Sequence, residues 1–151
     1  MKTEEENGLI EKLTGQYQSF SAGSIDSIVD LYSEDVEFID PVQRIVGRSA
    51  LRSYFQALGL NLTFCHFSFS STVKSRGDDG NDIAVLFWIM RFSHPKLNGG
   101  NASELSGCSH IIYTDKVIYQ RDYYDLGEMV YESIPLLGSV IRRIKLRLGE
   151  K

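Results

Sequence analysis

The hydrophobic periodicity of the chain changes at Gly59, and this change constrains the fold more than any other feature. Before Gly59, apolar residues recur at helical spacing in three segments, 9–20, 25–32 and 51–58. After it, stretches rich in aromatic and β-branched residues alternate with turn signals, which is typical of a strand meander. These stretches are 63–75, 83–92, 104–114 and 117–125. Helices followed by strands predict an α+β fold, with helices on one face of a mostly antiparallel sheet.

One early strand interrupts the helical part of the chain. The segment 36–40, VEFID, is apolar at alternate positions, and Pro41 ends it because proline cannot donate to a strand ladder. The residue before a proline is held extended, so the backbone of Asp40 has a defined direction. An isolated carboxylate at the end of a half-buried strand is costly to desolvate. We therefore expect the strand to open at Asp40 into a pocket; alternatively, Asp40 caps the turn through backbone amides.

Five strands with long aromatic runs predict a strongly curved sheet that encloses a conical apolar cavity. Trp88 and Met90 alternate on the strand 83–92, which has apolar residues on both faces. We expect one face to meet the cavity and the other to meet a second copy in a homodimer. Phe55 on the third helix and Tyr124 on the last strand are further candidates for the cavity lining. Such a cavity suits an apolar, ring-containing small molecule.

The last 17 residues form a separate amphipathic pattern. Leu137, Ile141, Ile144 and Leu148 share one helical face, and five basic residues stand against one acidic residue from position 135 onward. We therefore divide the chain into a domain at 1–134 and a basic helix at 135–151 that packs on the domain or extends from it. Packing on a dimer mate, peripheral contact with an anionic membrane and docking of a partner protein are the alternatives.

Composition limits the function classes. The chain has 151 residues and a net charge of −4, which indicates one domain and gives no support for nucleic-acid binding. The acidic first residues lack the apolar run of a signal peptide, and no segment has the length of a membrane span, so we expect a cytoplasmic protein. Two cysteines and three histidines show no metal-ligand spacing. We expect neither a metal nor a cofactor.

Residues 17–58, YQSFSAGSIDSIVDLYSEDVEFIDPVQRIVGRSALRSYFQAL, carry a family resemblance. A helix, a glycine turn, a strand ending in Asp-Pro and the Gly-Arg-x-x-Leu-Arg-x-Tyr helix start resemble the nuclear transport factor 2-like superfamily. This superfamily includes SnoaL-like polyketide cyclases and ketosteroid isomerases. The resemblance implies a cone-shaped barrel, in which a strongly curved sheet wraps over the N-terminal helices.

The resemblance also implies roles for individual residues. Asp40-Pro41-Val42 matches the segment that holds the general base of ketosteroid isomerases, and Tyr17 lies close to the position of their oxyanion donor. The protonated acid of those enzymes corresponds to the Ser109-His110 region, where this chain has no carboxylate. Asp122 resembles the acid/base aspartate that SnoaL-like cyclases carry on the last strand.

Together these residues predict a cofactor-free acid/base site, with catalytic candidates Asp40, Asp122, Tyr17 and His110. Either aspartate removes a proton, while Tyr17 or His110 stabilises the developing negative charge. His110 and Asp122 lie on consecutive strands, so they can face the same cavity and pair. The chemistry would be of isomerase or cyclase type on a carbonyl-bearing apolar compound. The alternative is a non-catalytic module that binds a ligand or dimerises, with a role in stress responses.

Overall fold

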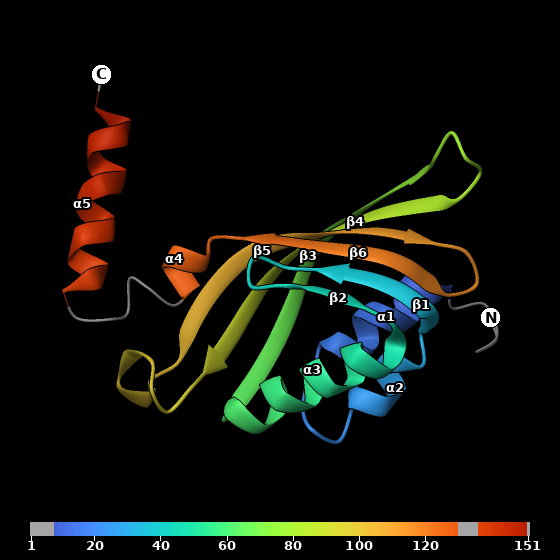
Figure 1. Ribbon diagram of the computed structural model, residues 1–151, viewed down its shortest axis with the longest axis horizontal. Coiled ribbons are helices and arrows are strands. Elements are labelled where there is room, and N and C mark those ends of the chain that lie inside the picture. The colour runs from blue at the N-terminus through green and yellow to red at the C-terminus, as the bar shows by residue number, and fades with distance from the viewer. Residues whose placement is uncertain (1–7, 130–135, 151) are drawn as a thin grey trace.

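The structure is a computed structural model that describes residues 8–129 and 136–150 (Figure 1). Three helices from the first part of the chain lie under a curved sheet, and two more follow the last strand. The helices are α1 (Leu9–Tyr17), α2 (Ile25–Val29), α3 (Arg48–Asn61), α4 (Leu126–Met129) and α5 (Leu137–Gly149), with a short 3-10 turn η2 (Asn98–Gly100). This arrangement confirms the predicted α+β class.

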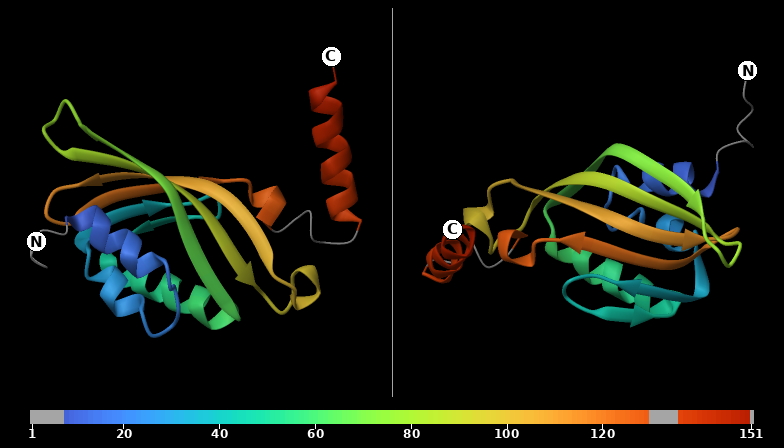
Figure 2. Two further views of the ribbon diagram at one scale, coloured as in Figure 1. Left: turned by 180° about the vertical axis from the view of Figure 1, so that it is seen from behind. Right: turned by 90° about the horizontal axis from the view of Figure 1, so that it is seen from above.

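Within the described residues, one six-stranded sheet has the order β2-β1-β6-β5-β4-β3. Its strands are β1 (Tyr32–Ile39), β2 (Arg44–Val46), β3 (Phe64–Arg76), β4 (Asp82–Ser93), β5 (Ser103–Tyr113) and β6 (Val117–Tyr124). The strands β3 to β6 form the predicted antiparallel meander. The sheet curves over α1, α2 and α3 as an open cone with β2 and β3 at its edges (Figures 1 and 2).

Two features of the first strands differ from the sequence prediction. The strand β2 was not expected; it forms a hairpin with β1 just after Pro41. The second helix ends at Val29, whereas we expected it to reach Tyr32, which instead begins β1. Tyr32 is fully buried in the core, and its main chain pairs with β6. Tertiary pairing therefore overrides the helical spacing at this position.

The third helix begins one residue earlier than its expected cap, Ser49. Its N-cap is Gly47, which has a φ of 95° and whose N–H donates to the carbonyl of Val36 at 2.8 Å. A φ in this region favours glycine, since a Cβ would clash with the backbone there. Gly47 thus ends β2, starts α3 and ties both to β1.

The core lies between the helices and the concave face of the sheet. Leu13, Ile28, Leu51, Val36 and Ile111 are all completely buried there, so each of α1, α2, α3, β1 and β5 contributes to one apolar layer. Phe55 stands at the centre of an aromatic cluster, with ring centroids 5.6–6.4 Å away. The cluster also contains Tyr17, Phe20, Tyr32, Phe38 and Tyr54.

The helix α5 stands apart from the cone (Figures 1 and 2). Lys145 forms an ion pair with Asp125, next to the start of α4, and Ile141 approaches Gly127. Most of the remaining surface of α5 faces solvent. Within residues 8–129 and 136–150, every helix is too short or too polar to span a bilayer.

Gly107 on β5 makes room for the single tryptophan of the chain. A Cβ at this position would lie 2.4 Å and 2.5 Å from two ring carbons of Trp88 and 2.8 Å from the carbonyl oxygen of Tyr123. Trp88 is 4% exposed and packs edge to face on Phe67, with ring centroids 5.4 Å apart. The indole can therefore approach the backbone of β5 this closely only because residue 107 has no side chain.

Gly107→Ala should lower the free energy of unfolding by about 1–3 kcal/mol, the usual cost of overpacking a core. Urea unfolding followed by Trp88 fluorescence measures the change. Gly15→Ala is the matched control, because a Cβ there meets nothing within 4 Å and alanine favours a helix interior. The free energy of unfolding of the control should rise by about 0.5–1 kcal/mol. Equal stability of Gly107→Ala and wild type would contradict this account of the Trp88 packing.

Candidate functional site

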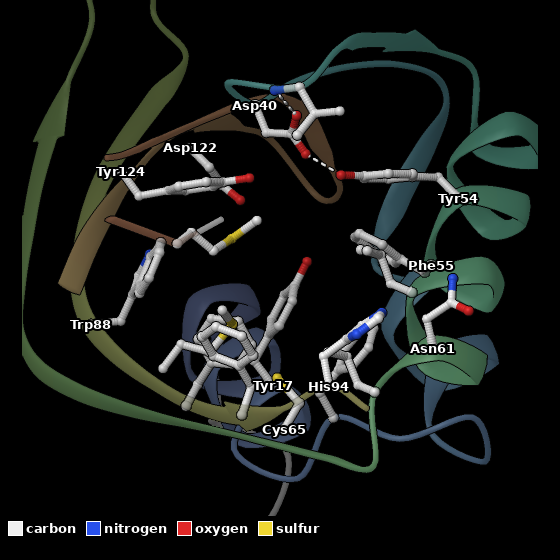
Figure 3. Close-up of a pocket in the computed structure, with 18 of the residues that line it drawn as sticks. Tyr17, Asp40, Tyr54, Phe55, Asn61, Cys65, Trp88, His94, Asp122 and Tyr124 are labelled. Atoms are coloured by element: carbon white, nitrogen blue, oxygen red, sulfur yellow. Dashed lines mark hydrogen bonds between the residues drawn. The ribbon is translucent and has the colours of Figure 1, made fainter. Parts of the chain in front are cut away.

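A cavity of about 460 Å³ lies between the concave face of the sheet and α3 (Figure 3). Its walls are mainly aromatic and aliphatic, and they include all four predicted lining residues: Phe55, Trp88, Met90 and Tyr124. The polar groups that line it are few: Tyr17, Asp40, Tyr54, Asn61, His94, Asp122 and Tyr124. A pocket of this size with a small number of convergent polar groups is typical of a small-molecule site.

Asp40 reaches the cavity because it directly follows β1. It shares the strand parity of the buried Phe38, so its side chain points to the concave side. One carboxylate oxygen, Oδ1, accepts hydrogen bonds from the backbone N–H groups of Val42 and Gln43 at 2.8 Å and 2.9 Å. The other, Oδ2, accepts a hydrogen bond from the Tyr54 hydroxyl. Asp40 therefore caps the turn and also lines the pocket, with both oxygens engaged.

Asp122 projects from β6 into the same cavity. Its Oδ1 accepts hydrogen bonds from the Ser109 hydroxyl at 2.6 Å and from the Gln120 amide at 2.9 Å. Trp88 in turn donates its indole N–H to Ser109 at 2.9 Å, which fixes that hydroxyl. Burial raises the pKa of Asp122 to about 6, and the charge of Asp40 adds to the rise, while the bonds from Ser109 and Gln120 oppose it.

A directed chain of hydrogen bonds connects Asp122 to the first helix. Because Gln120 gives its amide N–H to Asp122, its oxygen accepts from the Tyr32 hydroxyl, at 2.6 Å. The hydroxyl proton of Tyr32 is therefore already donated to Gln120. In the 2.6 Å hydrogen bond between the Tyr17 and Tyr32 hydroxyls, Tyr17 must then be the donor. The proton of Tyr17 is therefore directed away from the pocket in this arrangement.

Among the described residues that line the pocket, Tyr124, His94 and Asn61 have side-chain donors left for a ligand. The Tyr124 hydroxyl has no hydrogen-bond partner among the described residues, and burial raises its pKa, with a further contribution from Asp40 and Asp122. His94 accepts the backbone N–H of Lys96 on Nδ1 at 3.0 Å, so the neutral ring carries its proton on Nε2. Figure 3 shows Tyr124 with Asp122 on one wall, and His94 toward the end of α3.

His110 does not line this cavity. It pairs with Arg121 across β5 and β6, one residue out of step with the Ser109–Asp122 pair. Its ring packs edge to face on Tyr119, with centroids 5.7 Å apart, and Arg121 lies 5.0 Å above the Tyr123 ring. The pairing register sends His110 and Asp122 to opposite faces of the sheet, so the predicted His110–Asp122 pair is absent.

The structure thus brings Tyr17, Asp40 and Asp122 together and leaves His110 out. Sequence reasoning missed Tyr32, Tyr54 and Gln120. Gln120 had a usable signal, because it shares the parity of Asp122 on the same strand. The sequence gives no such signal for Tyr32 and Tyr54, because each belongs to an apolar stripe of helical spacing that indicates ordinary core packing. In the described part of the chain, no three His, Cys, Asp or Glu side chains are grouped as metal ligands.

Comparisons with known proteins identify the family that has this cone-shaped sheet and apolar cavity. The family model of the SnoaL-like domain matches residues 13–120. The chain therefore belongs to the SnoaL-like family. Its fold is similar to that of an NTF2-like protein. No curated protein matches the sequence.

Three solved structures illustrate the similarity of fold. A protein with a ketosteroid isomerase-like fold from Catenulispora acidiphila, in complex with trimethylamine, has a TM-score of 0.66 and 10% identity over 83% of this chain and 91% of that chain. A protein named as a polyketide cyclase from Xanthomonas campestris has a TM-score of 0.64 and 18% identity, over 81% of this chain and 91% of that chain. An NTF2-like protein of unknown function from Exiguobacterium has a TM-score of 0.64 and 13% identity, over 78% of this chain and 98% of that chain.

The raised pKa of Asp122 predicts a pH-dependent stability. The unfolded chain loses this proton near the ordinary pKa of 3.8, whereas the folded protein holds it to about 6. Between these values the folded state binds more protons, so its free energy of unfolding should fall as pH rises. From pH 4 to pH 7, the free energy of unfolding of wild type should fall by roughly 2–3 kcal/mol more than that of Asp122→Asn.

Urea unfolding at pH 4, 5, 6 and 7 measures this difference. Asp35→Asn is the control, because Asp35 is exposed on β1 and lies outside the pocket lining; it should follow the wild-type curve. If Asp122→Asn also followed wild type at every pH, the carboxyl of Asp122 would have an ordinary pKa in the fold.

Proposed function

We propose that this protein is a cofactor-free enzyme that moves a proton on a carbonyl-bearing, apolar ring compound, in a reaction of isomerase or cyclase type. The observation that carries the proposal is a single one. The carboxyl group of Asp122, whose pKa burial raises to about 6, projects into an apolar cavity of about 460 Å³. Membership of the SnoaL-like family and the polyketide cyclase name of the Xanthomonas protein support a small-molecule activity.

In the proposed reaction, Asp122 is the base. Its Oδ1 is held by Ser109 and Gln120, which leaves Oδ2 for the substrate. The carboxylate takes a proton from the carbon next to the carbonyl, and the electron pair moves to the carbonyl oxygen. The Tyr124 hydroxyl donates a hydrogen bond to that oxygen and stabilises the enolate. Asp122 then returns the proton to the same carbon or to a conjugated one.

The roles expected for Tyr17 and Asp40 change under this proposal. Tyr17 acts through Tyr32 and Gln120 by orienting the amide that holds Asp122, instead of donating to the substrate. Asp40, with both oxygens occupied, fixes the Tyr54 ring in the pocket wall. Both are therefore positioning residues.

Exchange of protons α to the carbonyl in D₂O tests the proposal, with 2-tetralone as an apolar ring ketone and ¹H NMR as the readout. Asp122→Asn should reduce the protein-dependent rate by about a hundredfold or more, and Tyr124→Phe by about a hundredfold. Tyr17→Phe should have the smaller effect, and Asp35→Asn none. For wild type, kcat/KM should rise with pH through about 6 as Asp122 ionises.

A non-catalytic ligand-binding module is the second candidate. It is favoured by the engagement of Tyr17, Tyr54 and both oxygens of Asp40 in bonds within the protein, which leaves few groups for chemistry. Quenching of Trp88 fluorescence by 2-tetralone, with an exchange rate equal to that of buffer, would support this alternative. Binding together with full exchange in Asp122→Asn would instead reject Asp122 as the base.

We also propose that the protein is a homodimer through the outer face of the sheet. Val73, Phe87, Ile89 and Tyr123 are 36–56% exposed on β3, β4 and β6, on the side away from the helices. Clustered exposed apolar side chains of this kind are typical of contact surfaces.

Phe87→Glu should weaken the dimer at least about tenfold, because it places a charge in the apolar contact. Light scattering during size-exclusion chromatography measures the mass over a concentration series. Leu60→Glu is the matched control, since Leu60 is exposed at the end of α3, away from the outer face of the sheet. A monomeric wild type at all concentrations would contradict the proposal.

A further inference from the structure

We propose that α5 docks the protein on the surface of a bilayer that contains anionic lipids. This helix exposes an apolar face. Leu137, Val140, Ile144 and Leu148 are 42%, 53%, 53% and 81% exposed, whereas the apolar residues of α1 and α2 are largely buried. At 100° per residue these four side chains, with the half-buried Ile141, fall in an arc of about 100°. The helix therefore presents one continuous apolar face to its surroundings.

Basic residues occupy the rest of the helix surface. Lys145 and Arg147 lie at the two edges of the apolar arc, and Arg142 and Arg143 lie behind them. Long cationic side chains beside an apolar face can reach lipid headgroups while leucine and isoleucine enter the acyl boundary. The rest of the chain is acidic, with a net charge of −8 for residues 1–134 against +4 for residues 135–151. Positive charge is thus concentrated on the segment that carries the exposed apolar face.

Charge also distinguishes a lipid surface from a second copy of α5. If two copies paired along their apolar arcs, Arg147 at one edge would face a basic edge of the other copy, whereas Lys145 at the other edge is already paired with Asp125. Glu150 is the one acidic residue in the described part of this segment, so it cannot neutralise the arginines of both copies. An anionic bilayer supplies negative charge at each edge and an apolar layer between them. We therefore assign the lipid surface as the occupant.

The position of α5 relates this surface to the cavity. Lys145 pairs with Asp125 beside α4, and Met129 of α4 lines the cavity. Leu62 and Leu97, which also line it, belong to the end of α3 and to the connection from β4 to η2. These segments and α5 lie at the same end of the molecule (Figure 1). Docking would bring this end of the cavity to the lipid, from which an apolar compound can enter; this last step rests on the proposed function, whereas the docking does not.

Cosedimentation of the full chain with vesicles tests the docking. Vesicles of 70% phosphatidylcholine and 30% phosphatidylglycerol are compared with pure phosphatidylcholine. Leu148→Glu and Leu146→Glu form a matched pair, because both add one negative charge at an exposed leucine, 81% and 70% exposed, on opposite faces of the helix. Leu148→Glu should bind about tenfold more weakly than Leu146→Glu, since it also removes an apolar anchor. Raising the salt to about 0.5 M should release wild type from the anionic vesicles.

Equal binding of the two variants, or equal binding of wild type to both kinds of vesicle, would overturn the proposal. Loss of a dimer in Leu148→Glu, without vesicle binding by wild type, would instead assign α5 to pairing between copies and would also overturn it. Exchange of 2-tetralone without vesicles serves as the independent check on the pocket. Both variants should keep the wild-type rate, so a failure of docking is distinguishable from a failure of the proposed function.

Discussion

The parallel pairing of β1 with β6 is the constraint on which the site depends. It places the first strand of the chain beside the last strand of the meander, with Ile39 opposite Arg121. An aspartate follows each of these two residues, Asp40 just past the end of β1 and Asp122 within β6, and both aspartates line the cavity. A shift of this register by one residue would turn Asp40 to the outer face, because the pairing of β6 with β5 fixes Asp122 on the concave side. Two carboxylates from distant parts of the chain are close only because these strands pair.

Hydrogen bonds from an ordered set of donors offset the free-energy cost of desolvating the Asp122 carboxylate in the apolar cone. Ser109 and Gln120 hold one carboxylate oxygen, and Trp88 and Tyr32 hold those two residues in turn. Because these bonds favour the ionised form while burial disfavours it, the pKa settles near 6 instead of rising further. The same contacts that satisfy a buried polar group also give it the proton affinity that acid/base chemistry near neutral pH requires.

The cone divides the surface into parts with different chemistry. The concave side holds the cavity, and the outer side of the sheet carries exposed Phe87 and Tyr123. The helix α5 extends the molecule beyond α4 and concentrates basic charge on a protein that is otherwise acidic. An apolar cavity, an apolar outer face and a basic amphipathic helix are separate surfaces, so each of the proposed contacts can be altered by a mutation that leaves the others in place.

Local sequence patterns were enough to predict the order of the elements except β2, the mostly antiparallel sheet and the apolar character of the cavity. Helical and strand periodicities are local, and Trp88, Met90, Phe55 and Tyr124 could be assigned to the lining from parity and composition. The sequence could also place Asp40 at a pocket, since Pro41 sets the direction of the strand end. The register of the strands could not be predicted from the sequence, because pairing between strands depends on contacts far apart in the chain. Long-range pairing and packing determine that Ser109, and not His110, faces Asp122 and that Tyr32 belongs to β1. They also direct the proton of Tyr17 to Tyr32.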